Sequence, residues 1–266
     1  MRRVGALGGV IVAAAIAIVE AHSAAAQAPL AHYAWLGHTA HSSLEARVPT
    51  PTGAERIPVT ADSFGAWLRH LPMLAPEQLV HLFDGSLKSR QDVHFAVVDL
   101  DVAHRDLQQC ADAVMRLWAE YLFATGQPDR IRFFPEPGKK RVIAWGGGRR
   151  RTGWAIYLTK LFADAGSASL QAQMRRAQGP VQPGDVLIQG GYPGHAVIVL
   201  DVAARSGGER YLLIGQSYMP AQQFHVVKNL DDSAISPWFK ESDLDGSTGL
   251  KTPEWRPFRR ADVRRF

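Results

Sequence analysis

Residues 106–123, DLQQCADAVMRLWAEYLF, decide the fold of this chain. Apolar side chains recur along them every three or four positions, which is the spacing of one buried face of an α-helix. Asp106 is the expected N-cap, Gln109 follows three residues later as in a capping box, and Gly126 is typical of a helix end. The stretch therefore predicts a helix whose first turn carries Cys110.

Strands are expected on both sides of this helix, where residue types alternate or form short apolar runs bounded by glycine. The expected strands cover residues 94–102, 185–189, 195–202, 211–218 and 224–228, and further helices are expected over residues 64–71 and 154–178. Helices come mainly first and antiparallel strands later. This order predicts an α+β fold in which the helix with Cys110 packs on an antiparallel sheet.

The composition is that of an ordinary globular protein. Of 266 residues, 46% are hydrophobic and 21% are charged, which excludes a disordered or fibrous chain. Residues 29–266 are expected to form a single domain that opens with an extended lead-in over residues 29–60. The net charge is +5 and no motif combines basic with aromatic residues, so no nucleic-acid partner is expected. The basic stretch 139–151 is expected to be a surface loop of open role.

The first 28 residues have the pattern of a cleaved export signal peptide. Arg2 and Arg3 precede an apolar run over residues 4–19, and small residues at 23–28 offer cleavage sites. The apolar run is short for a membrane span, so no stable transmembrane segment is expected after signal cleavage. We therefore expect a periplasmic or secreted protein.

Cys110 is the only cysteine of the chain, which excludes an internal disulfide and a multi-cysteine metal site. Exported proteins meet oxidising conditions, so an unpaired cysteine there is either buried or kept for chemistry. At a helix start, unpaired backbone N–H groups and the helix dipole favour a thiolate, which predicts a lowered pKa for the Cys110 thiol. The alternative is a core cysteine, since free cysteine is among the most buried residue types.

His195 is the expected base for this nucleophile. It opens a strand directly after a glycine-rich connection, at a sheet edge that a ligand can reach. A polar group on the next strand would orient its ring. If the hairpin turn centres on Gly207, His195 shares a face with Ser217 and Met219. If the register slips by one residue, it shares that face with Gln216 and Tyr218. We favour Gln216, whose amide accepts a hydrogen bond from an imidazole N–H.

A nucleophile also needs donors that stabilise an oxyanion. Gln108 and Gln109 directly precede Cys110, and either amide is a candidate donor beside the backbone N–H of Cys110. We favour Gln109, so the candidate catalytic residues are Cys110, His195, Gln216 and Gln109. No cofactor and no metal site are expected.

This arrangement resembles the papain-like cysteine hydrolases, and among them the compact NlpC-like cell-wall peptidases. The matching stretches are QCAD at 109–112, PGDVLI at 183–188 and GHAVIV at 194–199. The resemblance implies a papain-like, NlpC-like core and hydrolysis of an amide, in a cell-wall peptide or another substrate, through a thioester on Cys110. NlpC-like enzymes usually carry Asp before the cysteine, where this chain has Gln109.

A second resemblance extends over almost the whole chain after the predicted signal. The stretches at 106–117, 194–198 and 216–222, with SPW at 236–238 and TPEW at 252–255, resemble the exported bacterial domain-of-unknown-function family 4846. That resemblance implies no known activity. The alternative to a hydrolase is therefore a non-catalytic periplasmic module of the same fold, which binds peptidoglycan or another envelope component.

Overall fold

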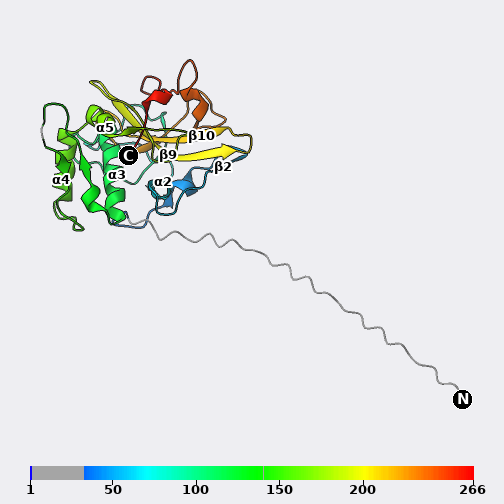
Figure 1. The fold of residues 1–266 in the computed structure, drawn as a ribbon, viewed down its shortest axis with the longest axis horizontal. Helices are drawn as coiled ribbons and strands as arrows, with labels where there is room; N and C mark the ends of the chain where they lie inside the picture. The colour runs from blue at the N-terminus through cyan, green and yellow to red at the C-terminus, as the bar shows by residue number, and fades with distance from the viewer. Residues whose placement is uncertain (2–32, 140) are drawn as a thin grey trace. The chain divides into compact units, whose positions relative to one another are not determined.

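The helix predicted around Cys110 is α3 (Cys110–Ala124), which packs on the long strand β9 (His195–Arg205) (Figure 1). This computed structural model describes Met1 and residues 33–139 and 141–266. Beyond Met1, the predicted export signal lies outside the described residues. The described residues from 33 onward belong to one compact unit.

β9 belongs to a sheet of nine strands within the described residues, and its strands pair antiparallel throughout. In order across the sheet lie β4 (His94–Val97), β11 (His225–Val227), β10 (Arg210–Gln216), β9, β8 (Val186–Gln189), β13 (Val263–Arg265) and β7 (Arg175–Arg176), with β12 (Trp238–Lys240) beside β10 and β2 (Ala54–Arg56) beside β9. The predicted combination of helices with an antiparallel sheet is confirmed.

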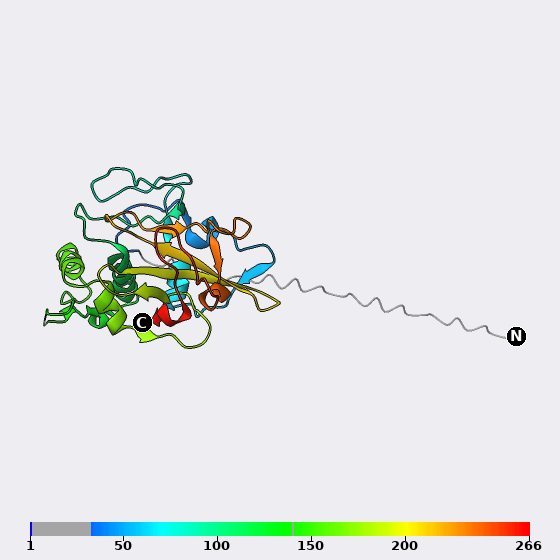
Figure 2. The ribbon, with the colours of Figure 1, turned by 90° about the horizontal axis from the view of Figure 1, so that it is seen from above.

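The remaining elements are short. They are the strand pairs β1 (Ser42–Ser43) with β3 (Pro72–Met73) and β5 (Arg132–Phe133) with β6 (Ile143–Ala144), the helices α1 (Leu44–Arg47), α2 (Phe64–Arg69), α4 (Trp154–Asp164) and α5 (Ser167–Gln173), and the 3-10 turns η1 (Pro128–Arg130), η2 (Glu241–Leu244) and η3 (Arg260–Asp262). Helices α3 to α5 gather at one end of the unit (Figure 2).

Two expected segments differ from the observed elements. The single helix expected over residues 154–178 is broken between α4 and α5, because Gly166 is extended and the Ser169 hydroxyl accepts its backbone N–H in place of a continuing helical bond. The expected lead-in over residues 29–60 contains the helix α1, which was not expected, while β2 pairs with β9 as the edge strand that an extended lead-in allows. Leu44 is fully buried there, so this segment contributes to the core.

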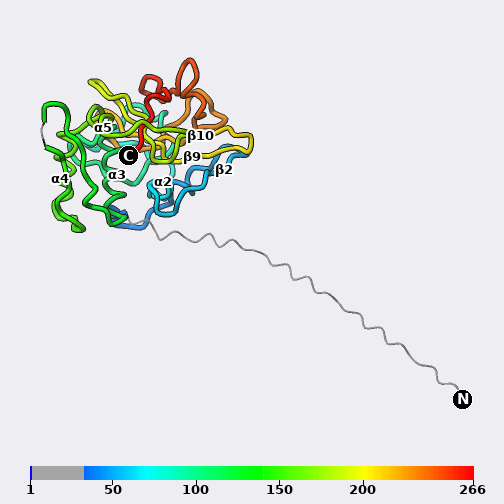
Figure 3. The backbone as a smooth tube through the Cα atoms, viewed as in Figure 1, coloured from blue at the N-terminus to red at the C-terminus, as the bar shows by residue number. Residues whose placement is uncertain are grey.

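The two faces of the sheet bury two separate apolar clusters. Ala196 and Ile198 of β9 point to the face covered by α3, and Cys110 belongs to the same cluster. Val197 and Val199 point to the opposite face, where Phe258 packs. The C-terminus lies beside α3 (Figure 3). There the ring of Phe266 stacks on Trp118 with centroids 4.4 Å apart. All of β9 up to Ala203 is buried as a result.

A β-bulge at Leu200 decides which side chains share a face with His195. Near the turn, Leu213 pairs with Asp201, which is the register of a hairpin centred on Gly207. Beyond the bulge, Ile214 pairs with Val199, so the register has slipped by one residue. Both registers considered from the sequence therefore occur in the one hairpin, and the slipped one governs the end that carries His195.

Asp201 explains why the bulge forms at this point. Its carboxylate is almost fully buried and accepts hydrogen bonds from the guanidinium groups of Arg56 and Arg69 at 2.6 and 2.7 Å. It also accepts the backbone N–H of Val202 at 2.8 Å. These contacts hold the extra residue of the bulge in place.

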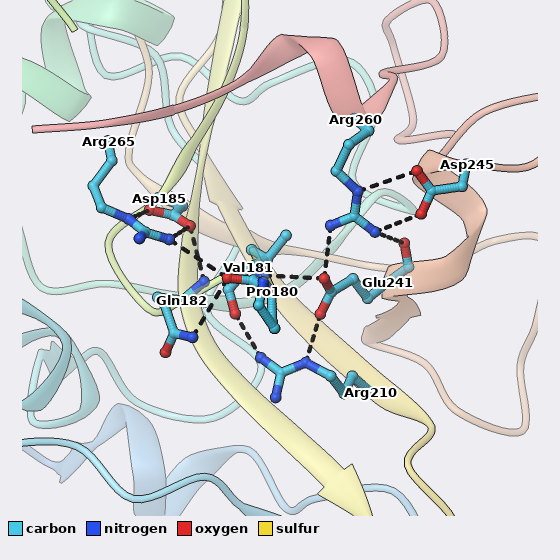
Figure 4. Close-up of polar contacts among 9 residues, drawn as sticks. All are labelled: Pro180, Val181, Gln182, Asp185, Arg210, Glu241, Asp245, Arg260 and Arg265. Carbon is cyan, nitrogen blue, oxygen red and sulfur yellow. Dashed lines mark hydrogen bonds and ion pairs between the residues drawn. The ribbon is translucent and has the colours of Figure 1, made fainter. Parts of the chain in front are cut away.

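A second buried network ties the C-terminal strand to the sheet (Figure 4). Asp185 directly precedes β8. It accepts two hydrogen bonds of 2.6 Å from Arg265 and one from the backbone N–H of Gln182. Glu241 accepts hydrogen bonds from Arg210 at 2.7 Å and from Arg260 at 2.6 Å. Both carboxylates use both oxygens, so this network is complete.

Candidate active site

Helix α3 begins at Cys110, and the local contacts explain why. Gln109 is the N-cap, and its backbone N–H donates to the Asp112 carboxylate at 3.1 Å. The prediction that Asp106 is the N-cap is wrong, because its carboxylate instead accepts the Ala221 N–H at 2.7 Å and the Gln109 side-chain amide at 2.9 Å. Asp106 thus joins the start of α3 to the loop after β10.

A surface cleft of about 270 Å³ lies at this helix start. Cys110 and Gln109 line it from α3, and Tyr192 and Gly194 line it from the connection before β9. On the remaining sides are residues of three other segments: Glu136, Phe162, Ala165, Gly166, Ser167 and Met219. As the first residue of α3, Cys110 has a backbone N–H without an intrahelical acceptor, and Cys110 is one of the residues that line the cleft.

The Cys110 thiol is buried, with 6% of the residue exposed. Burial raises its pKa to about 11, although a hydrogen bond from the backbone of Ala196 opposes this change. The predicted lowering of the thiol pKa is therefore wrong: desolvation by the surrounding core outweighs the helix N-terminus. The thiol is neutral at pH 7, and it lies against the residue that follows His195.

His195 and Gln216 meet as predicted. The His195 ring is fully buried, and its Nε2 lies 3.3 Å from Oε1 of Gln216. Burial lowers the pKa of His195 to about 4, although the Gln216 hydrogen bond opposes the change, so the ring is neutral at pH 7. Within the described residues, its Nδ1 has no hydrogen-bond partner, and no hydrogen bond joins it to the Cys110 thiol.

The other sequence candidates have structural partners. The Ser217 hydroxyl donates to the carbonyl of Gln222 at 2.8 Å, so it is not the group that orients His195. The Tyr218 ring packs edge-on to His195, with centroids 5.1 Å apart, and its hydroxyl donates to the carbonyl of Glu254. Gln108 is fully buried and accepts from Arg116 at 2.6 Å, which leaves Gln109 as the glutamine at the cleft.

Three residues around Gln216 were not predicted from the sequence to belong to the site. Glu254 accepts the Gln216 amide at 3.0 Å and pairs with Lys88 at 2.5 Å, and both charged side chains are more than nine-tenths buried. Trp255 packs on the His195 ring with centroids 4.9 Å apart. In the sequence, the TPEW stretch at 252–255 indicates a family resemblance but no role for Glu254 or Trp255.

Glu254 holds its place in a costly backbone conformation. Its φ is 74°, in the left-handed region that residues with a Cβ rarely adopt. Such strain persists where surrounding contacts over-determine it, and it is typical of functional sites. Here the carbonyl of Glu254 is fixed by Tyr218 and its side chain by Lys88 and Gln216.

The described part of the chain offers no support for a metal site or a membrane-spanning helix. No cluster there of three or more His, Cys, Asp or Glu side chains is arranged to hold a metal ion. None of the helices described is both long and apolar enough to cross a membrane. The expected basic loop at 139–151 contains β6, and Arg151 makes two hydrogen bonds, at 2.6 and 2.9 Å, to the buried carboxylate of Glu120, so it is not a solvated charge.

Comparison with known proteins gives one match. The model of a family described as a domain of unknown function (4846) matches residues 44–152 and 147–265, which together cover most of the chain. No curated protein and no solved structure matches it. The matched segments include the start of α3, all of β9 and β10, and the Glu254 segment.

Proposed function

The chain belongs to the domain-of-unknown-function family 4846, and because that description carries no activity, we propose a function from the geometry of the cleft. The protein is a cysteine hydrolase that cleaves an amide through a thioester. Cys110 is the nucleophile, His195 the base and Gln216 the residue that orients the base. Gln109 and the backbone N–H of Cys110 stabilise the oxyanion.

One observation carries this proposal. The buried ring of His195 is held at Nε2 by Gln216, while Nδ1 has no hydrogen-bond partner among the described residues. Buried polar atoms in folded proteins are nearly always paired, and exceptions call for an explanation such as catalysis. The only thiol of the chain accepts a hydrogen bond from the backbone of Ala196, the residue after His195, and Cys110 lines a cleft. A base oriented through one ring nitrogen, with a thiol against the backbone of the next residue, supports nucleophilic catalysis.

The reaction then follows from the protonation states. Both groups are neutral, so the Cys110 proton passes to Nδ1 of His195 as Sγ attacks the carbonyl carbon of the amide. The C–N bond breaks and the leaving amine takes the proton from His195, which leaves a thioester on Cys110. Water attacks the thioester, gives its proton to Nδ1 and releases the carboxylic acid as the proton returns to Sγ. The step requires Sγ and Nδ1 to come within hydrogen-bonding distance when substrate fills the cleft.

The substrate class and the compartment are part of the proposal. We place the protein outside the inner membrane, in the periplasm or secreted, on the pattern of residues 1–28. A cell-wall peptide is the amide that this compartment supplies in quantity. The papain-like, NlpC-like core is proposed on the same basis, with support from a cysteine that starts a helix and a histidine that opens the strand beneath it.

A second candidate function rests on one observation. The thiol is buried, its pKa is raised and it makes no hydrogen bond to the imidazole within the described residues. A core cysteine behaves in this way. In this alternative, the protein is a non-catalytic module that binds an envelope component in the same cleft.

The single thiol allows a direct test of the two candidates. Purified protein is incubated with isolated peptidoglycan fragments, and released products are separated by mass. We expect wild-type protein to release new amino and carboxyl ends. We expect Cys110→Ala and His195→Ala to lose this activity by roughly 10³-fold or more. Glu241→Gln, in the network of Figure 4, is the control for lost stability. Full activity in Cys110→Ala would exclude the hydrolase, and binding without cleavage by every variant would favour the module.

A further inference from the structure

Every polar atom of the Gln216 side chain has an assigned partner. Oε1 faces Nε2 of His195 at 3.3 Å, and Nε2 faces Glu254 at 3.0 Å and Nε2 of His225 at 3.4 Å. The residue is fully buried. The amide therefore lies between two histidines and a carboxylate.

The partners of the amide nitrogen can only accept. Glu254, as a carboxylate paired with Lys88 at 2.5 Å, offers acceptor oxygens alone. His225 faces the carbonyl of Gln223 with Nδ1 at 2.9 Å, so its proton is on Nδ1 and its Nε2 accepts. A flipped amide would place Oε1 against these two acceptors. Its NH₂ group is thus fixed toward Glu254 and its carbonyl toward His195.

From this geometry we infer that Glu254 and Lys88 are positioning residues that set the tautomer of His195 through Gln216. Since Oε1 of Gln216 can only accept, Nε2 of His195 must carry the proton. Nδ1 of His195 then carries the lone pair, on the nitrogen that has no hydrogen-bond partner in the described residues. The inference rests on the proposed function only for its use in catalysis, because the tautomer itself follows from the contacts.

The burial of the pair explains why a charged partner is used. Lys88 and Glu254 are 6% and 9% exposed at their side chains, and Lys88 also lies over the Tyr218 ring at 5.5 Å. A neutral side chain at position 254 could donate as well as accept a hydrogen bond. It would therefore allow the Gln216 amide group to flip by 180°. A buried carboxylate held by a lysine cannot change its role in this way. The strained backbone of Glu254 supplies the exact placement.

The test is the ¹⁵N spectrum of the imidazole rings in histidine-labelled protein near pH 7, with His195 assigned from a His195→Gln sample. In wild-type protein we expect Nε2 of His195 to be protonated and Nδ1 to be of the bare, pyridine-like type. In Glu254→Gln we expect the Nδ1–H form to rise by about ten-fold or more, the change expected when a hydrogen bond to a charged group is lost. The double variant Lys88→Met/Glu254→Gln, which leaves no unpaired lysine, should show the same change if the single variant folds poorly.

The control removes a comparable charge elsewhere. Glu241→Gln affects another buried carboxylate, near the opposite end of β10, and should leave the His195 tautomer unchanged. An unchanged tautomer in both Glu254 variants would overturn the inference, even if the protein proves to be a hydrolase. If the tautomer changes but neither the wild-type protein nor any variant cleaves wall fragments, the inference stands and the proposed function is wrong.

Discussion

Two groups of buried polar side chains belong to the same sheet but differ in how fully they are paired. In the network of Figure 4, Asp185 and Glu241 use both carboxylate oxygens in hydrogen bonds to arginines and backbone N–H groups. Around Cys110 and His195, by contrast, Nδ1 of His195 and Oδ1 of Asp112 are buried and have no hydrogen-bond partner in the described residues. The buried carboxylates of the Figure 4 network are therefore fully hydrogen-bonded, whereas His195 and Asp112 each keep one buried atom without a partner.

The difference separates a structural task from a chemical one. A buried carboxylate that is fully paired fixes the chain, and removing its partner leaves a costly charge. A buried group that is partly paired stores an unsatisfied interaction, which a substrate can satisfy. The network at Glu241 therefore accounts for stability, and the partly paired His195 accounts for the proposed chemistry.

Breaking the complete network should have the largest effect on stability. Burial alone would raise the pKa of Glu241, but the Val181 N–H, Arg210 and Arg260 outweigh burial and lower it. In Glu241→Ala, the two arginines lose their common acceptor, and we expect the free energy of unfolding to fall by about 3 kcal/mol. Chemical denaturation at pH 7 measures this. A loss no greater than that of an exposed surface substitution would show that the network is not structural.

The buried ring of His195 should instead affect the pH dependence of stability. Burial lowers the pKa of His195 to about 4 in the folded protein, against about 6.5 in an unfolded chain. As pH falls from 6.5 to 4, the unfolded chain takes up a proton that the folded ring refuses, so stability decreases over this window and the loss is complete below pH 4. We expect His195 to account for about 3 kcal/mol of it.

Denaturation curves at pH 7 and pH 4.5 measure this effect. The difference between the two pH values should be smaller in His195→Gln than in wild type. Some dependence should remain in that variant, because burial also lowers the pKa of His225, to about 3. An equal dependence in wild type and His195→Gln would mean that the folded ring titrates normally and is not buried as described.

The sequence predicts the features that depend on local patterns and misses those that depend on long-range contacts. Apolar spacing located α3 and the strand that begins at His195, since both patterns are local. The choice between Gln216 and Ser217 depended on a bulge held by Asp201 with Arg56 and Arg69, which come from far earlier in the chain. Local spacing cannot show such a contact.

The protonation state of the Cys110 thiol could not be predicted from the sequence either. A helix start predicts a lowered thiol pKa, but the core that closes around Cys110 raises it, and that core forms only when α3 meets β9. The pairing of Lys88 with Glu254 joins two loops that are distant in sequence and have no shared pattern. Residues that act through long-range burial are therefore the ones missed.

The smallest expected effect sharpens the comparison between the two carboxylates Asp112 and Asp185. Burial raises the pKa of Asp112 well above its usual range, whereas the Asp185 carboxylate is bound by Arg265. Asp112→Asn keeps an oxygen to accept the Gln109 N–H and should change the free energy of unfolding by less than about 0.5 kcal/mol. Asp185→Asn should cost clearly more, because it removes the charge that Arg265 binds. Parallel denaturation of both variants at pH 7 measures the contrast, and equal losses would place Asp112 among the ionised structural carboxylates.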